Sequence, residues 1–170
     1  MLNGILAINK NEPELASRVI LKLSDFLRYL LYDNNHNQVY LSAEVRFITD
    51  FLELEKMRRD NFTYEIRYDL SQPGGVKIPP HVLLTLVENA VKHSSDSVRP
   101  SCVELNLQLN GNRITVFCKN SVASETSKIT TGGLGLVNMH RRLQLLFADK
   151  FELFVNKEVN FYTVNLSIPI

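Results

Sequence analysis

The sequence predicts an α+β fold, with an N-terminal helical hairpin over residues 1–60 and an α/β sandwich over residues 61–170. Two patterns lead to this prediction. Apolar residues recur at helical spacing in the first part of the chain, whereas later they alternate with polar residues, as in strands. The order of the later elements favours a mostly antiparallel sheet with helices on one face. With 45% apolar residues among 170, the chain can bury a sizeable core.

The hairpin consists of two amphipathic helices. The first is expected over residues 13–33 and ends at the polar stretch 33–37. The second begins after Ser42, a good N-cap, with Glu44 in its first turn. Its apolar stripe consists of Val45, Ile48, Leu52 and the apolar part of Met57. Because such a hairpin leaves one stripe uncovered, we expect residues 1–60 to form a homodimer.

The second part contains five longer strands and two helices. The strands are expected near residues 62–70, 103–109, 114–118, 151–156 and 161–168, and the helices over 80–93 and 135–148. A turn at Pro73-Gly74-Gly75 follows the first strand, and Asn110-Gly111 predicts a two-residue hairpin loop. The stretch 120–133 is rich in Ser, Thr and Gly and has no periodicity, which predicts a mobile lid.

Composition excludes several classes of function. The net charge is +1 without a basic stripe, which argues against nucleic acid as a partner. No apolar run reaches transmembrane length and no signal peptide is visible. The two cysteines, Cys102 and Cys118, are expected to be reduced thiols, and a zinc site is not expected. The apolar start, Met1 to Ile8, indicates a piece cut from a longer protein.

The helix at 80–93 carries Glu88, Asn89, Lys92 and His93 beside an apolar stripe. An Asn oxygen suits a magnesium ion already carried by phosphates. Glu88 could orient or deprotonate an attacking group, and Lys92 could neutralise phosphate charge. The alternative is an amphipathic helix whose polar face is simply solvated.

The second motif is Gly132, Gly133 and Gly135 in front of the helix at 135–148. Backbone N–H groups at a helix N-terminus bind phosphate well, although such glycines can also form a mere flexible loop. Arg141 and Arg142 indicate a solvated helix face from which one side chain could reach a phosphate. Together the two motifs predict a nucleotide site that is neither a P-loop nor a Rossmann fingerprint.

These residues resemble the cytoplasmic part of LytS-type sensor histidine kinases. Glu88-Asn89-Ala90-Val91-Lys92-His93, with the lead-in Ile78-Pro79-Pro80, is similar to the N box of that family. The run from Gly133 to Asn138, followed by Arg142-Leu143, is similar to its second glycine box. Ser42-Ala43-Glu44 and the run from Phe51 to Arg58 resemble the end of its helical region.

The resemblance implies a Bergerat-type ATP-binding fold that uses ATP and Mg²⁺. It implies that Asn89 binds the metal, and the residues point to Glu88 as the catalytic carboxylate. The implied ATP-binding residues are Asn89, Lys92, His93, Asn120, Thr131, Gly132, Gly133, Leu134, Gly135 and Leu136. Such kinases transfer the γ-phosphoryl group of ATP to a histidine, and then to a response regulator. They reach the membrane through segments outside this chain, so the region is expected on the cytoplasmic side of an inner-membrane sensor.

Two departures from the family pattern matter. The family's acceptor histidine lies in a stretch that would end just before Met1, so His36, His81, His93 and His140 are not nominated as acceptors. We therefore expect the chain to bind ATP without phosphorylating itself.

The second departure concerns the base. The residue matching the family's adenine-reading Asp is expected to be Lys119, which cannot accept a hydrogen bond, although the Asn120 carbonyl oxygen can. The alternative function is therefore a non-catalytic signalling and dimerisation module with weak or no ATP binding. An ATPase that performs mechanical work has no support, because no transducer domain is present.

Overall fold

In a computed structural model of the chain, the structure describes residues 13–32, 37–69, 75–94, 99–122 and 134–170. The helices are α2 (Pro13–Tyr32), α3 (Leu41–Arg58), α4 (Val82–His93) and α5 (Leu134–Phe147). The strands are β1 (Val39–Tyr40), β2 (Phe62–Asp69), β3 (Lys77–Ile78), β4 (Ser101–Asn110), β5 (Arg113–Ser121), β6 (Glu152–Lys157) and β7 (Phe161–Pro169). Each helix and longer strand expected from the sequence is therefore present, and the α+β class is confirmed.

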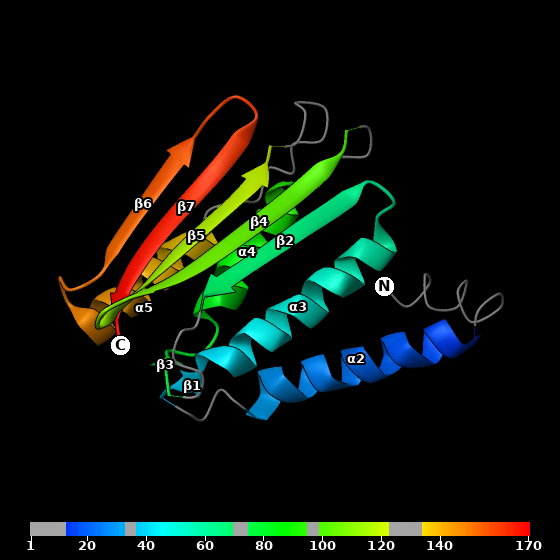
Figure 1. The fold of residues 1–170 in the computed structure, drawn as a ribbon, viewed down its shortest axis with the longest axis horizontal. Helices are drawn as coiled ribbons and strands as arrows, with labels where there is room; N and C mark the ends of the chain where they lie inside the picture. The colour runs from blue at the N-terminus through cyan, green and yellow to red at the C-terminus, as the bar shows by residue number, and fades with distance from the viewer. Residues whose placement is uncertain (1–12, 33–36, 70–74, 95–98, 123–133) are drawn as a thin grey trace.

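The main sheet has the strand order β2-β4-β5-β7-β6. The β2–β4 pair is parallel and the other three pairs are antiparallel, as the prediction of a mostly antiparallel sheet requires. Helices α4 and α5 lie on one side of this sheet, and α3 runs beside β2 (Figure 1). The short strands β1 and β3 form a separate antiparallel pair that the sequence did not predict, because two residues are too few to show a period.

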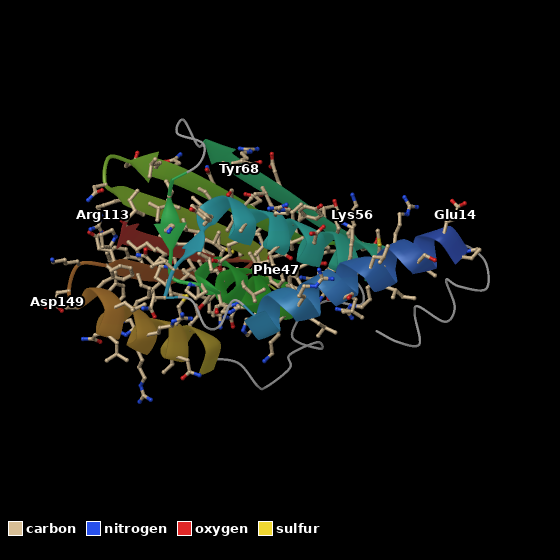
Figure 2. The ribbon with its side chains drawn as sticks, turned by 90° about the horizontal axis from the view of Figure 1, so that it is seen from below. Glu14, Phe47, Lys56, Tyr68, Arg113 and Asp149 are labelled. Atoms are coloured by element: carbon tan, nitrogen blue, oxygen red, sulfur yellow. The ribbon has the colours of Figure 1, made fainter. Side chains whose placement is uncertain are left out.

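Helix α2 lies along α3, and its end near Glu14 projects beyond the sheet (Figure 2). Val19 and Leu54 are buried between the two helices. Beside them, Lys22 of α2 forms ion pairs with Asp50, at 2.6 Å, and with Glu53 of α3. The helical hairpin is thus joined by an apolar contact and a charged one.

Two details of α3 differ from the prediction. The helix begins at Leu41 and its N-cap is Tyr40, so the assignment of Ser42 as N-cap is wrong. The Leu41 N–H instead donates to the Val76 carbonyl at 2.9 Å, so backbone pairing next to β1 and β3 takes the place of a side-chain cap. Met57 is 43% exposed and does not belong to the buried stripe, whereas Val45, Ile48 and Leu52 do.

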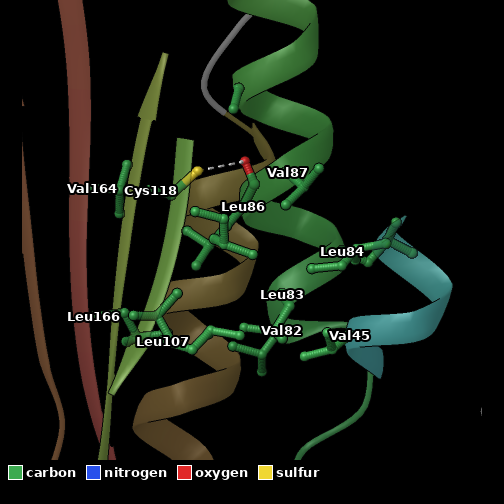
Figure 3. Packing of buried hydrophobic residues seen from close by; sticks show 14 of the residues in the cluster. Val45, Val82, Leu83, Leu84, Leu86, Val87, Leu107, Cys118, Val164 and Leu166 are labelled. Atoms are coloured by element: carbon green, nitrogen blue, oxygen red, sulfur yellow. Dashed lines mark hydrogen bonds between the residues drawn. The ribbon is translucent and has the colours of Figure 1, made fainter. Parts of the chain in front are cut away.

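The core lies between α4 and the sheet (Figure 3). Alternate residues of β4 and β5 face it, among them Leu107 and Cys118. The Cys118 Sγ lies 3.9 Å from the Leu86 carbonyl oxygen of α4, and burial raises the pKa of this thiol to about 12. Cys118 is therefore a small apolar core residue that stays protonated, as expected for a reduced thiol.

The hairpin loop lies one residue later than the sequence predicted. Asn110 pairs with Arg113, so the loop residues are Gly111 and Asn112. Gly111 has a φ of 59°, which glycine adopts without strain. The predicted lid also begins later, because residues 120 and 121 belong to β5; residues 123–133 lie outside the described residues.

The other face of the sheet is mostly polar, although Phe117, Phe154 and Phe161 also lie on it. Two ion pairs lie on this face, Glu65 with Arg67 within β2 at 2.7 Å and Glu104 of β4 with Lys119 of β5 at 4.0 Å. No helix within the described ranges is long and apolar enough to cross a membrane.

Candidate nucleotide site

Helix α4 carries the first motif at the border between its buried and exposed faces. Leu83, Leu86, Val87, Ala90 and Val91 are buried, as the sequence predicted. Glu88 and Lys92 are exposed, whereas Asn89 and His93 are half-buried. The polar residues therefore form one edge of the helix, where the apolar stripe fixes their direction.

The orientation of the Asn89 amide is set by its own helix. Its Nδ2 donates a hydrogen bond to the Thr85 carbonyl oxygen at 2.7 Å. A carbonyl oxygen can only accept, so the nitrogen must be on this side, and the Asn89 Oδ1 is on the other. Thr85 is a supporting residue that the sequence reasoning missed, although its position one turn before Asn89 could have indicated it.

The first turn of α5 lies directly against this amide. A Cβ atom added to Gly135 would come within 2.8 Å of Asn89 Nδ2 and 3.2 Å of Asn89 Oδ1. A side chain at residue 135 would therefore displace the Asn89 amide. The fold thus brings the two motifs, which are far apart in the sequence, into contact.

A third segment reaches the same end of α4. The His93 ring lies 6.3 Å from the Tyr162 ring, centroid to centroid, and Tyr162 is the strand partner of Asn120. Asn120 is buried on the sheet face that packs against α4, and its Nδ2 donates to the Ser121 carbonyl at 2.7 Å. His93 and Asn120 thus lie near one another, as expected for residues of one site. Tyr162 had no signal in the sequence beyond strand alternation.

Lys119 points the opposite way. Its Nζ lies 4.1 Å from the centre of the Phe161 ring and 4.0 Å from Glu104 Oε2, on the polar face of the sheet. Successive strand residues face opposite sides, so Lys119 and Asn120 cannot both face α4. The expectation that Lys119 stands in the adenine-reading position is therefore wrong, and Asn120 is the β5 residue on that side.

Burial away from water is the main cause of the shifted pKa values of Glu88 and His93 on α4. Desolvation raises the pKa of Glu88 and lowers the pKa of His93, where Lys92 and Lys157 add to the effect. The His93 imidazole is therefore neutral at neutral pH. Among the described residues, no three His, Cys, Asp or Glu side chains gather as a metal site. A magnesium ion at Asn89 would thus depend on a ligand's own oxygens, as is usual for this ion with nucleotides.

The predicted site residues around the start of α5 fall on both sides of the limit of the described residues. Thr131, Gly132 and Gly133 lie outside the described residues, and Leu134 is the first residue of α5. Leu136 packs against the core. Arg142, a candidate for phosphate contact, instead donates from Nη1 to the Pro80 carbonyl oxygen at 2.9 Å and so joins α5 to the start of α4.

Comparisons with known proteins find histidine kinases. The histidine kinase family model matches residues 1–62. Sensor protein LytS of Staphylococcus epidermidis is 30% identical over 182 residues, covering 99% of this chain and 31% of that protein. Sensor histidine kinase YpdA of Escherichia coli is 26% identical over 183 residues, with 99% and 32% covered. The chain thus spans about a third of the length of these relatives.

Solved structures share the fold. The catalytic domain of histidine kinase ThkA superposes with a TM-score of 0.57 at 18% identity, covering 78% of this chain and 93% of that one. The histidine kinase domain of the Erythrobacter litoralis EL346 blue-light-activated kinase gives 0.56 at 17% identity, covering 91% and 74%. Over 99% of its length the chain is thus similar to LytS-type sensor histidine kinases, and its sheet and helices share the fold of solved histidine kinase catalytic domains.

Proposed function

We propose that this region binds magnesium-ATP and presents its γ-phosphoryl group to an acceptor histidine, as part of a sensor histidine kinase of a two-component system. The observation that carries the proposal is the contact between Gly135 and the Asn89 amide. The packing of α5 on α4 brings the N-box helix and the start of the helix after the glycine motif to one place. Because a side chain at residue 135 would displace the Asn89 amide, this close approach supports a single binding site built from both motifs.

Asn89 is the residue best suited to the metal. With Nδ2 donated to Thr85, its Oδ1 remains as a neutral oxygen ligand. Bound magnesium would neutralise phosphate charge. Lys92 would add a second positive charge at the phosphates, and the N-terminus of α5 would add backbone donors.

Asn120 is the residue best suited to the base. Because its Nδ2 donates to Ser121, its Oδ1 is the atom that would accept from the exocyclic amine of adenine. Guanine carries an acceptor at that position and would leave Oδ1 without a donor. Asn120 would thus provide the hydrogen-bond acceptor that the family's Asp provides, without its charge.

Transfer requires an acceptor imidazole in line with the γ-phosphate, because phosphoryl transfer depends mostly on positioning and charge stabilisation. His93 lies beside Tyr162 on the nucleotide helix itself and is better placed to contact phosphate than to attack in line. We therefore propose that the acceptor lies upstream of Met1, and that Glu88 orients it or accepts its proton.

The partners follow from the same proposal. Residues 1–60 would form the helical dimerisation region, since Ile20, Leu21 and Leu27 of α2 are at least half exposed. The structure of histidine kinase ThkA in complex with the response regulator TrrA is known, and the kinase in that complex superposes on this chain with a TM-score of 0.52. A response regulator is the expected phosphoryl recipient, and the membrane would be reached only through segments outside this chain.

The experiment that tests the proposal is calorimetric titration of magnesium-ATP against the chain and its Asn89→Ala variant. The parent should bind, and the variant should keep its fold but lose the magnesium-dependent part of its affinity. Equal affinities with and without magnesium in both proteins would contradict the assignment of Asn89.

A second candidate function is the non-catalytic signalling module. Its motivation was Lys119, which faces away from α4 and so gives it no support. Acid-labile phosphate on a longer protein that includes the upstream segment would distinguish the kinase from this module.

A further inference from the structure

Helix α4 has no cap of its own at its N-terminus. Its N-cap residue, His81, has a φ of 62° and makes no side-chain capping bond, and its first turn contains no acidic residue. The first N–H groups of a helix have no intrahelical partners. Here Glu44 of α3 supplies the acceptor: its Oε1 accepts from the N–H of Leu83 at 2.8 Å and of Leu84 at 3.3 Å.

The other end of α4 is held by the same helix. Arg59, which ends α3, donates from Nη2 to the Val91 carbonyl oxygen at 3.2 Å. Its guanidinium lies 3.1 Å from the buried Glu55 and 5.3 Å from the centre of the Phe62 ring. Arg59 is thus fixed by its surroundings before it reaches α4.

Both contacts match the helix dipole. A carboxyl group lies at the positive N-terminal end of α4 and a guanidinium at the negative C-terminal end. The order of the contacts also fits, because Glu44 in the first turn of α3 contacts the first turn of α4, and Arg59 at the end of α3 contacts Val91 near the end of α4. The two helices therefore run in the same direction with their ends joined.

Burying the Glu44 carboxyl group costs more desolvation free energy than an apolar side chain at this position would. The side chain is fully buried, and within the described part of the chain its Oε2 makes no hydrogen bond. An apolar residue would fill the space between α3 and α4 without this desolvation. Arg142 of α5 adds a second polar contact at the same end through Pro80, so three helices meet there by directional bonds.

We propose that Glu44 and Arg59 are positioning residues of the nucleotide site, through which α3 sets the place of α4 and so of Asn89 against Gly135. The inference rests on the nucleotide site proposed above. Apolar surfaces can slide over one another, whereas hydrogen bonds at both ends of a helix cannot shift without breaking. A displacement of the helical hairpin would therefore reach Asn89 through α4.

The test compares Glu44→Ala, Glu44→Gln and Arg59→Ala with two matched controls, Asp50→Ala and Glu53→Ala. Asp50 and Glu53 are also on α3 and form ion pairs, both with Lys22 of α2, and neither pair involves α4. Each folded variant is titrated with magnesium-ATP, and the Asn89 side-chain amide is followed by NMR without nucleotide.

Glu44→Ala and Arg59→Ala should bind magnesium-ATP about tenfold more weakly, the size expected when a helix cap is lost. Their Asn89 amide resonances should shift. Glu44→Gln should stay near the parent, since its carbonyl oxygen accepts from the same N–H groups. The controls should match the parent in both measurements.

Parent affinity and an unshifted Asn89 resonance in folded Glu44→Ala and Arg59→Ala would overturn the proposal. If Glu44→Ala fails to fold, Arg59→Ala decides by the same two measurements. A parent that does not bind magnesium-ATP would overturn the nucleotide site instead, and the NMR shift would still test the coupling of α3 to Asn89.

Discussion

Gly135→Ala should separate the stability of the fold from the integrity of the nucleotide site. The added methyl group would lie 2.8 Å from Asn89 Nδ2, which is too close, so the Asn89 amide must move. That movement breaks its hydrogen bond with Thr85, at a cost of about 1 kcal/mol. Alanine also favours a helix over glycine by up to about 1 kcal/mol. The two terms oppose each other, so the free energy of unfolding should change by less than about 1 kcal/mol.

Nucleotide affinity should respond much more strongly. A displaced Asn89 amide no longer directs Oδ1 toward the metal, and we expect magnesium-ATP to bind at least about tenfold more weakly, or about 1.4 kcal/mol. Urea unfolding measures the first quantity and calorimetric titration the second. Gly75→Ala is the control, because an added Cβ there meets no atom within 4 Å.

The double variant with Asn89→Ala makes the reasoning sharper. If Gly135→Ala acts only by moving the Asn89 side chain, then adding Gly135→Ala to the Asn89→Ala variant should cause almost no further loss of magnesium-ATP affinity. Parent affinity for magnesium-ATP in Gly135→Ala would refute the contact as the basis of the site.

Two further predictions follow from buried and outward-facing charges. Burial raises the pKa of Glu44 to about 7, against the opposing hydrogen bonds from Leu84 and Leu83 and the charge of Arg142. The folded state therefore binds a proton that the unfolded state releases, and stability should fall as pH rises from about 4.5 to 7, by on the order of 3 kcal/mol. Unfolding curves of Glu44→Gln should lack this contribution, and a parallel pH dependence in parent and variant would contradict it. Lys119→Ala should leave magnesium-ATP affinity unchanged within about twofold, because its contacts lie on the far face of the sheet; a large loss in titration would mean that Lys119 reaches the nucleotide.

The sequence predicted the helices and longer strands well because their periodic patterns repeat over many residues. The stripe of α4 and the alternation of β4 and β5 extend over enough residues to identify both type and buried face. The prediction was wrong at the start of α3, where a backbone carbonyl distant in the sequence takes the place of a side-chain cap. Ser42 has the chemistry of an N-cap, but the Val76 carbonyl accepts from the Leu41 N–H, and the helix begins two residues earlier than that cap would place it.

The site was predictable in its motifs but not in its geometry. Asn89 and Gly135 could be named from residue type and spacing, whereas their contact depends on how α5 packs on α4. Alternation along β5 could have excluded Lys119, because Cys118 and Asn120 share the apolar side. The role of Glu44 could not be read, since a Glu in the first turn of a helix is ordinarily a favourable exposed charge.

The parallel pairing of β2 with β4 also has a consequence for the order in which the elements are expected to fold. The β4–β5 hairpin closes across two loop residues, whereas the pair of Phe62 with Ser101 closes a segment that contains all of α4. Contacts between residues distant in sequence form late, because the entropy of the intervening chain opposes them. The hairpins of β4–β5 and β6–β7 can therefore assemble first. The pair of Ser121 with Phe161 closes a segment of similar length that contains α5, so the pairings β5–β7 and β2–β4, and with them the positions of α5 and α4, are expected to be fixed after the hairpins.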